Sequence, residues 1–96
     1  QPEADFKKRF EMLARLNSLQ MLTLAVTPNH LSRELFEYFC WCLAKMQHLR
    51  RVSCRIEKAN IEDKDWKLKV VKVFNGIKHL NWGYVSSKSG IIDFEK

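Results

Sequence analysis

The chain has 96 residues, enough for one domain, and its 46% hydrophobic content excludes a disordered tail. Seventeen basic and eleven acidic residues give a net charge of +6, which is open to two interpretations: an acidic protein partner or nucleic acid, or a basic surface that only aids solubility. No stretch approaches 18 uninterrupted apolar residues, so we expect no membrane-spanning helix.

A first helix is predicted to begin at Pro2, because proline suits the first helical turn and the acids beside it are favoured by the helix dipole. Phe6, Phe10 and Leu13 lie three to four residues apart and form one apolar face. A strand is predicted at 22–26, where LTLAV alternates between apolar and other side chains.

A second helix is predicted to begin near Thr27–Asn29, where a threonine or asparagine side chain can cap it. Its apolar stripe comprises Leu35, Phe36, Phe39, Cys40 and Leu43. The alternation in VSCRI then predicts a second strand at 52–56.

A third helix is predicted with Asn60 as its cap and Asp63 as the acid of a capping box. Asn75–Gly76 is expected to end that helix in a left-handed conformation. A third strand is predicted at 83–86. The last segment, 91–96, reads IIDFEK and is expected to start a fourth strand or to pair with something else.

One apolar frame occurs three times, once in each helix–strand unit. Its positions are Leu13, Leu16, Leu19, Leu22 and Leu24, then Leu43, Met46, Leu49, Val52 and Cys54, then Phe74, Ile77, Leu80, Gly83 and Val85. The second copy follows the first by 30 residues and the third follows by 31. Five matched positions in three copies indicate a structural repeat, with units at about 3–26, 31–56 and 61–86 of a single domain, 1–96.

Helices alternating with strands predict an α/β fold in one of two architectures. The first is a solenoid of about three stacked helix–strand units, with a short parallel sheet lining its concave face. The second is a small open three-stranded α/β sheet. Stacked repeats need a shared frame and a doubly wound sheet does not, so the repeat favours the solenoid.

The frame L-x-x-L-x-x-L-x-L resembles that of leucine-rich repeats of the long, helix-containing kind, as in ribonuclease-inhibitor-like, NLR and F-box-associated repeats. The resemblance covers about residues 10–86. Two departures mark a divergent member. Thr27, Glu57 and Lys88 stand where these families often place Asn or Cys. Gly83 stands where a leucine belongs, which indicates a degenerate repeat or a gap that a neighbour fills.

The resemblance implies that strand residues between the frame positions face a concave surface where partners dock. By position these are Met21, Thr23 and Ala25, then Arg51, Ser53 and Arg55, then Trp82, Tyr84 and Ser86. All of them except Ala25 are our predicted partner-binding residues. Neighbouring strands lie about 4.8 Å apart, so Arg51 is expected to flank Trp82 and Ser53 is expected to flank Tyr84. Arginines beside aromatic rings are typical of interaction hot spots, although Trp82 could instead cover the end of the core.

The sequence contains no motif typical of a catalytic or metal site. It contains no glycine-rich phosphate loop, no G-x-S-x-G elbow and no H-E-x-x-H, so we expect neither an enzyme nor a cofactor. Cys40 and Cys42 form a C-x-C pair and Cys54 stands alone, unlike the C-x-x-C pairs of metal sites. We expect no metal site, and buried free thiols in a reducing compartment.

The leading hypothesis is a non-catalytic protein–protein interaction module that grips an acidic or mixed-charge protein through Arg51, Arg55, Trp82 and Tyr84. The resemblance implies settings such as a substrate receptor of an F-box ubiquitin ligase, or a scaffold. The alternative is RNA binding, as in the repeat domains of messenger-RNA export factors. A third possibility is a spacer or cap. We expect an intracellular location, cytoplasmic or nuclear, and a place in a longer chain or complex.

Overall fold

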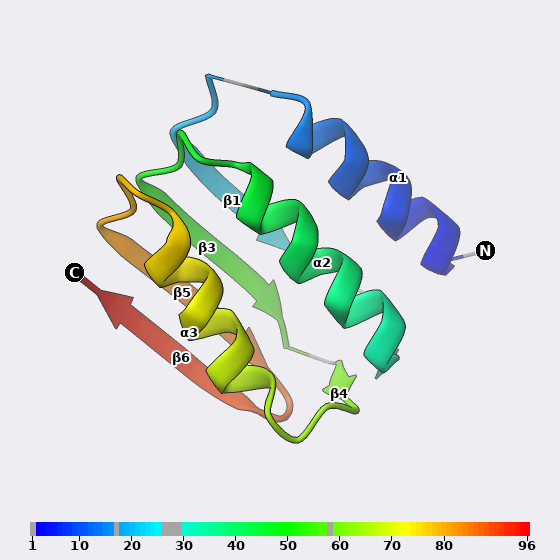
Figure 1. The fold of residues 1–96 in the computed structure, drawn as a ribbon. Coiled ribbons are helices and arrows are strands. Elements are labelled where there is room, and N and C mark those ends of the chain that lie inside the picture. The colour runs from blue at the N-terminus through cyan, green and yellow to red at the C-terminus, as the bar shows by residue number, and fades with distance from the viewer. Residues whose placement is uncertain (1, 17, 26–29, 58) are drawn as a thin grey trace.

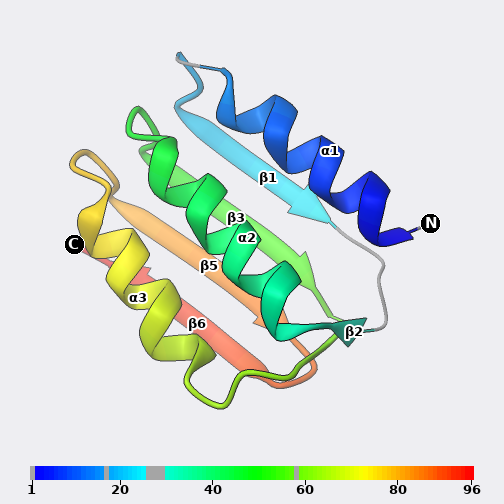
Figure 2. The ribbon, with the colours of Figure 1, turned by 45° about the vertical axis from the view of Figure 1, so that its right-hand side comes forward.

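Helices and strands alternate along the chain and form two layers (Figure 1). The computed structural model describes residues 2–16, 18–25, 30–57 and 59–96. The helices are α1 (Pro2–Ala14), α2 (Arg33–Lys45) and α3 (Trp66–Gly76). The strands are β1 (Met21–Ala25), β2 (His30–Leu31), β3 (Arg51–Ile56), β4 (Asn60–Ile61), β5 (Trp82–Ser87) and β6 (Gly90–Glu95). All three helices lie over the same face of the larger sheet (Figures 1 and 2).

The larger sheet has four strands in the order β1-β3-β5-β6. The first three are parallel and β6 is antiparallel to β5, so the sheet is mixed. This confirms an α/β fold, and the expected strand near 91–96 is β6, the fourth strand of this sheet, which begins at Gly90. The structure fits the second expected architecture, the small open α/β sheet, with four strands where three were expected. A solenoid would require a superhelical stack, which four strands do not define.

The register of the three parallel strands follows the sequence frame. Leu22 is paired with Val52, and Val52 is paired with Gly83, so the three frame positions form one ladder across the sheet. The expected neighbours are also confirmed, because Arg51 lies beside Trp82 and Ser53 lies beside Tyr84. The strand order along the sheet is the order along the chain for β1, β3 and β5.

The backbone turns at equivalent frame positions in all three units. The same amide-to-carbonyl hydrogen bond joins Leu16 to Leu13 at 3.1 Å, Met46 to Leu43 at 3.0 Å, and Ile77 to Phe74 at 3.2 Å. Between units, the Gln20 carbonyl accepts from the Arg50 amide at 2.7 Å, and the Arg50 carbonyl accepts from the Asn81 amide at 2.8 Å. The sequence repeat is therefore also a repeat of backbone geometry.

The second helix begins later than the sequence predicts. The expected start at Thr27–Asn29 lies outside the described residues, and α2 begins at Arg33. Its cap is Ser32, whose hydroxyl accepts a hydrogen bond from the Leu35 amide at 3.2 Å. The physical reason is the short strand β2, which pairs with β4 and keeps the chain extended up to the cap.

The third helix ends at Gly76 as predicted, but its predicted start and the left-handed conformation at its end were wrong. Asn60 belongs to β4, and Asp63 accepts from the Asp65 amide at 2.9 Å, so it forms a turn instead of a capping box. The helix begins at Trp66. Gly76 is its last residue, and the only glycine with a positive φ among the described residues is Gly90. Pairing of β4 with β2 again holds the preceding segment extended.

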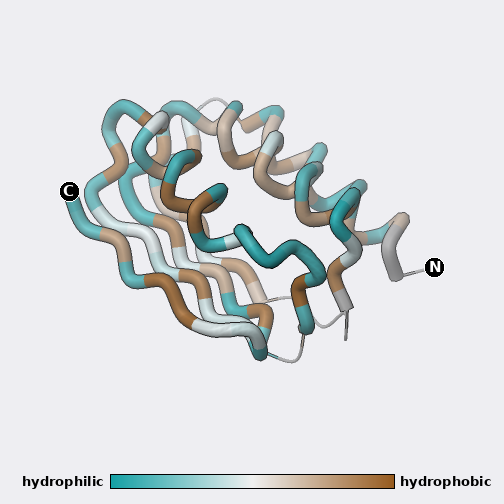
Figure 3. The backbone as a smooth tube through the Cα atoms, turned by 60° about the horizontal axis from the view of Figure 1, so that its bottom comes forward, coloured by the Kyte–Doolittle hydropathy of each residue, from teal (hydrophilic) through white to brown (hydrophobic). Residues whose placement is uncertain are grey.

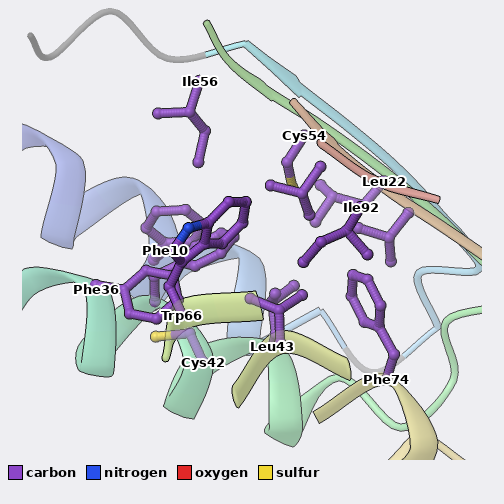
Figure 4. Packing of buried hydrophobic residues seen from close by; sticks show 14 of the residues in the cluster. Phe10, Leu22, Phe36, Cys42, Leu43, Cys54, Ile56, Trp66, Phe74 and Ile92 are labelled. Atoms are coloured by element: carbon purple, nitrogen blue, oxygen red, sulfur yellow. The ribbon is translucent and has the colours of Figure 1, made fainter. Parts of the chain in front are cut away.

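The hydrophobic core lies between the helices and the sheet (Figures 3 and 4). An aromatic chain links the helices: ring centroids are 4.5 Å apart for Phe6 and Phe10, 4.8 Å for Phe10 and Phe39, and 6.4 Å for Phe36 and Trp66. The stripe predicted for α2 is buried except for Cys40, which is half-buried, whereas Cys42 is fully buried. This core anchors the sheet and leaves its other face to solvent.

Candidate interaction face

The face of the sheet turned away from the helices carries three rows of side chains, and we call it the open face. It exists because each strand alternates buried and more exposed residues. Across the strands β1, β3, β5 and β6, the rows are Met21, Arg51, Trp82 and Glu95, then Thr23, Ser53, Tyr84 and Asp93, then Ala25, Arg55, Ser86 and Ile91. All eight predicted partner-binding residues lie here, and their role in binding stays a prediction.

Trp82 is held from three sides on the open face. Its ring stacks on Tyr84 with centroids 6.0 Å apart and planes 6° from parallel. The Arg51 guanidinium lies 5.4 Å from the indole centroid, and the indole Nε1 donates a hydrogen bond to Asp93 Oδ1 at 3.2 Å. Trp82 therefore stands on the open face and does not cover the end of the core.

Two hollows border the Arg51–Trp82 pair. One has a volume of about 430 Å³ and is lined by Arg51, Asn81, Trp82, Glu95 and Lys96. The other has a volume of about 250 Å³ and is lined by Met21, Leu22, Thr23, Arg51, Ser53 and Trp82. Because both hollows share the arginine and the indole, a partner could place one side chain on each side of the pair.

Charge is divided across the open face. Strand β3 contributes Arg51 and Arg55, whereas β6 contributes Asp93 and Glu95. The rings of β5 lie between the basic and the acidic strand. A surface with this division matches a partner that carries both signs of charge.

The sequence prediction missed the residues that β6 adds to the open face, namely Ile91, Asp93 and Glu95. The signal was present, since 91–95 alternates and Ile92 and Phe94 point toward the core. A tight turn returns the chain to pair Ser87 with Gly90, whose φ of 141° is one that glycine readily adopts.

A second aromatic surface lies on the helices, and we call it the helix groove. Tyr38 stacks on Trp41 at 5.8 Å, and the Lys45 amine lies 3.8 Å from the Trp41 centroid. The Tyr38 hydroxyl donates to Glu11 at 2.8 Å, and this bond raises the pKa of the phenol above its usual value. A hollow of about 440 Å³ is lined by Glu11, Ala14, Arg15, Tyr38, Trp41 and Lys45. No sequence pattern had pointed to these residues.

The three cysteines are free thiols. Burial raises the pKa of Cys40 and of Cys54 to about 12, and it also raises the pKa of Cys42. They are therefore protonated at neutral pH and are poor nucleophiles or metal ligands. Within the described ranges, no group of three or more His, Cys, Asp or Glu residues is placed to hold a metal ion. In the same ranges, none of the helices combines the length and apolar character needed to cross a membrane.

Comparisons with known proteins gave no matching family model, no matching curated protein and no matching solved structure. Membership of the leucine-rich-repeat family therefore stays a prediction from the sequence frame. The chemistry of the open face is likewise argued from its own residues.

Proposed function

We propose that this chain is a non-catalytic protein-interaction module whose open face binds an extended protein segment of mixed charge. The observation that carries the proposal is the stack of Arg51, Trp82 and Tyr84 on a sheet face that no described helix covers. Tryptophan, tyrosine and arginine are the residues most enriched among binding hot spots.

The stack is already ordered without a partner. The hydrogen bond from Trp82 to Asp93 and the ring contact with Tyr84 restrict the indole before anything binds. A side chain that is fixed in advance loses less conformational entropy on binding, so more of the contact energy appears as affinity. Arg51 adds a planar donor that can bond a carboxylate through two parallel hydrogen bonds.

The division of charge on the open face indicates which side chains a partner would carry. An acidic side chain would lie near Arg51 and Arg55, and an apolar side chain would lie over the rings of β5. A basic side chain would lie near Asp93 and Glu95. A segment that carries these three groups in sequence matches the face from β3 to β6.

We further propose that the three helix–strand units are stacked repeats of the leucine-rich kind and take part in a larger complex. The ladder through Leu22, Val52 and Gly83 and the repeated turn hydrogen bonds support this architecture. A role as receptor or scaffold in an intracellular assembly, such as a ubiquitin ligase, would use the same face. Inserting a second copy of 27–56 after Ile56 tests the stacking. A chain of stacked repeats would fold cooperatively with a higher thermal midpoint, and a small open sheet that is not built of repeats would not.

The binding proposal can be tested without knowing the natural partner. Random peptides of about 12 residues, long enough to cross the sheet when extended, are displayed on phage and selected on the wild-type chain. Selected peptides, synthesised and titrated by fluorescence anisotropy, should combine acidic, apolar and basic residues. Trp82→Ala and Arg51→Ala should each weaken their Kd about tenfold, equivalent to about 1.4 kcal/mol.

The helix groove supplies the matched controls. Trp41→Ala and Lys45→Ala remove the same kind of cation–ring pair from the opposite layer and should leave peptide affinity unchanged. Peptides whose binding is lost with Trp41→Ala but kept with Trp82→Ala would overturn the assignment of the open face. Failure to select any saturable peptide would overturn the proposed function itself.

RNA binding is the second candidate, because bases stack on exposed rings beside arginine. Asp93 and Glu95 oppose it, since both would lie close to the phosphates of a strand stacked on Trp82. The test is the anisotropy of a random single strand of about 20 nucleotides, longer than a typical site. We expect no saturable binding that depends on Trp82. Binding that Trp82→Ala weakens, and that falls steeply with salt, would favour RNA over the protein partner.

A further inference from the structure

The first helix–strand unit leaves its frame residues incompletely buried. Leu16 is 51% exposed, whereas the equivalent residues Met46 and Ile77 are 3% and 0% exposed. Leu13, Leu19 and Leu24 are only partly buried. Their counterparts in the other two units are fully buried: Leu43 and Phe74, Leu49 and Leu80, Cys54 and Val85. The core therefore opens at the edge formed by α1 and β1.

Strand β1 is also an unguarded edge. It forms one end of the sheet, and its sequence, MLTLA from Met21 to Ala25, contains no charged residue and no proline. The opposite edge strand, β6, carries Asp93 and Glu95. Natural proteins place charges on edge strands to prevent pairing with other chains, so an uncharged edge is suited to pairing.

Helix α1 adds a stripe of exposed residues above this edge. Asp5, Arg9 and Met12 follow one another at helical spacing and are exposed, and the exposed Leu16 follows two residues after the helix ends at Ala14. The three helical residues lie on the side away from α2, because Lys7 and Glu11 both contact Tyr38 of α2. Met12 is 67% exposed. The stripe carries one acid and one base, so it has no net charge although the chain carries +6.

We propose that this edge binds a second copy of the chain, with the two β1 strands antiparallel about a two-fold axis. The axis stands perpendicular to the sheet, so all helices stay on one face and two four-stranded sheets become one sheet of eight strands. Met12 of α1 and Leu16, just after the helix, become buried between the two copies. The acidic edge strands β6 form the outer limits, so the assembly closes at two copies.

A second copy fits the edge better than an unrelated strand does. The same strand on the other side of the axis turns Leu22 and Leu24 toward the helices and continues the core without interruption. A stripe without net charge meets its own copy without the repulsion that two +6 chains otherwise feel. The dimer would present two open faces on one side and so bind a repeated partner with avidity.

Sedimentation velocity of the wild-type chain tests the proposal, from about 1 μM to about 200 μM, a range that brackets a micromolar Kd. We expect a concentration-dependent shift from monomer to dimer. Leu16→Glu, and independently Met12→Glu, should raise the dimer Kd at least about tenfold, because each buries a carboxylate in an apolar contact. Leu68→Glu is the matched control, since Leu68 is 73% exposed on α3, and it should leave the dimer intact.

Hydrogen exchange provides a second readout at the backbone. Amides of β1 should exchange more slowly as wild-type concentration rises, and they should lose this dependence in Leu16→Glu. Circular dichroism checks that each variant is folded. A chain that sediments as a monomer over the whole range would overturn the proposal, and so would a dimer that Leu68→Glu disrupts and Leu16→Glu leaves intact.

Discussion

The ring of Phe74 in α3 fills the space that a side chain at position 83 of β5 would need. A Cβ placed on Gly83 would stand 2.6 Å from the Phe74 Cε2 atom. Gly83 is the frame position that lacks its leucine, and it faces Phe74, a frame position of the same unit that carries a larger residue. Phe94 of β6 closes the other side, with its ring centroid 5.4 Å from that of Phe74. The gap expected from the sequence is filled by this neighbour.

Gly83→Ala should destabilise the fold, although alanine is closer than glycine to the repeat consensus. Phe74 is fully buried, so its ring has little room to move away from the added methyl group. Overpacking of this kind costs about 1–3 kcal/mol. Urea denaturation followed by circular dichroism should show the loss as a lower midpoint with an unchanged slope.

Replacing the Phe74 ring with a smaller side chain should reduce the loss of stability caused by Gly83→Ala. Phe74→Leu alone leaves a cavity and is destabilising, but in the Gly83→Ala background it should cost less than it does alone. The free energies of unfolding of the four proteins form a double-mutant cycle. Additive effects would show that the two positions do not compete for the same space.

The repeated frame predicted the sheet register because side chains at equivalent positions must share one layer of the core. The helix starts could not be predicted in the same way. Strands β2 and β4 have two residues each, too short to show any alternation, yet their pairing displaces both helix starts. Asn60 has the chemistry of a helix cap and lies in β4 because the ladder overrides local propensity.

The open face was predicted only where its strands belong to the repeat. The residues of β1, β3 and β5 were implied by the resemblance to leucine-rich repeats, and the spacing of neighbouring strands then placed Arg51 beside Trp82. Strand β6 belongs to no copy of the repeat and runs in the opposite direction. Asp93 and Glu95 were therefore missed, and with them the partner for the Trp82 indole and the acidic half of the face.

Removing the Asp93 carboxylate should loosen Trp82. Asp93→Ala leaves the indole N–H without its protein acceptor, and the lost bond corresponds to about 0.5–1.5 kcal/mol. The affinity for selected peptides should fall by a few-fold, together with a weaker near-ultraviolet tryptophan signal. Asp93→Asn keeps an acceptor oxygen and should stay close to wild type in the spectrum. Equal spectral changes in both variants would show that the charge, and not the hydrogen bond, positions the ring.

Asp63 should make stability depend on pH in the acid range. The buried carboxylate accepts a hydrogen bond from the Lys69 amine, which also lies 3.6 Å from Glu37 of α2. The hydrogen bond from Lys69 lowers the pKa of Asp63 below its usual 3.8. Because the folded-state value is lowered, the stabilisation is complete above pH 3.8 and disappears as the pH falls through the lowered value.

Asp63→Asn should therefore lower the thermal midpoint at neutral pH, and its deficit relative to wild type should shrink below pH 3.8. Thermal unfolding at a series of pH values measures both quantities. Asp65→Asn is the control, because the Asp65 side chain makes no capping hydrogen bond to α3. A deficit of constant size at every pH would assign the effect of Asp63→Asn to packing instead of charge.

The three cysteine thiols should react slowly with thiol reagents in the native protein. Burial raises the pKa of Cys40 and Cys54 to about 12, so almost no thiolate forms at about pH 8, where an unperturbed cysteine is partly ionised. A chromogenic disulfide reagent should label three thiols quickly in denaturant and none quickly in buffer. Cys54 lies fully buried in β3, a central strand, so the reagent can reach it only when the sheet opens. Its labelling rate in the native protein should therefore fall when the free energy of unfolding is increased. Fast labelling of Cys54 without denaturant would contradict the burial of β3 between β1 and β5.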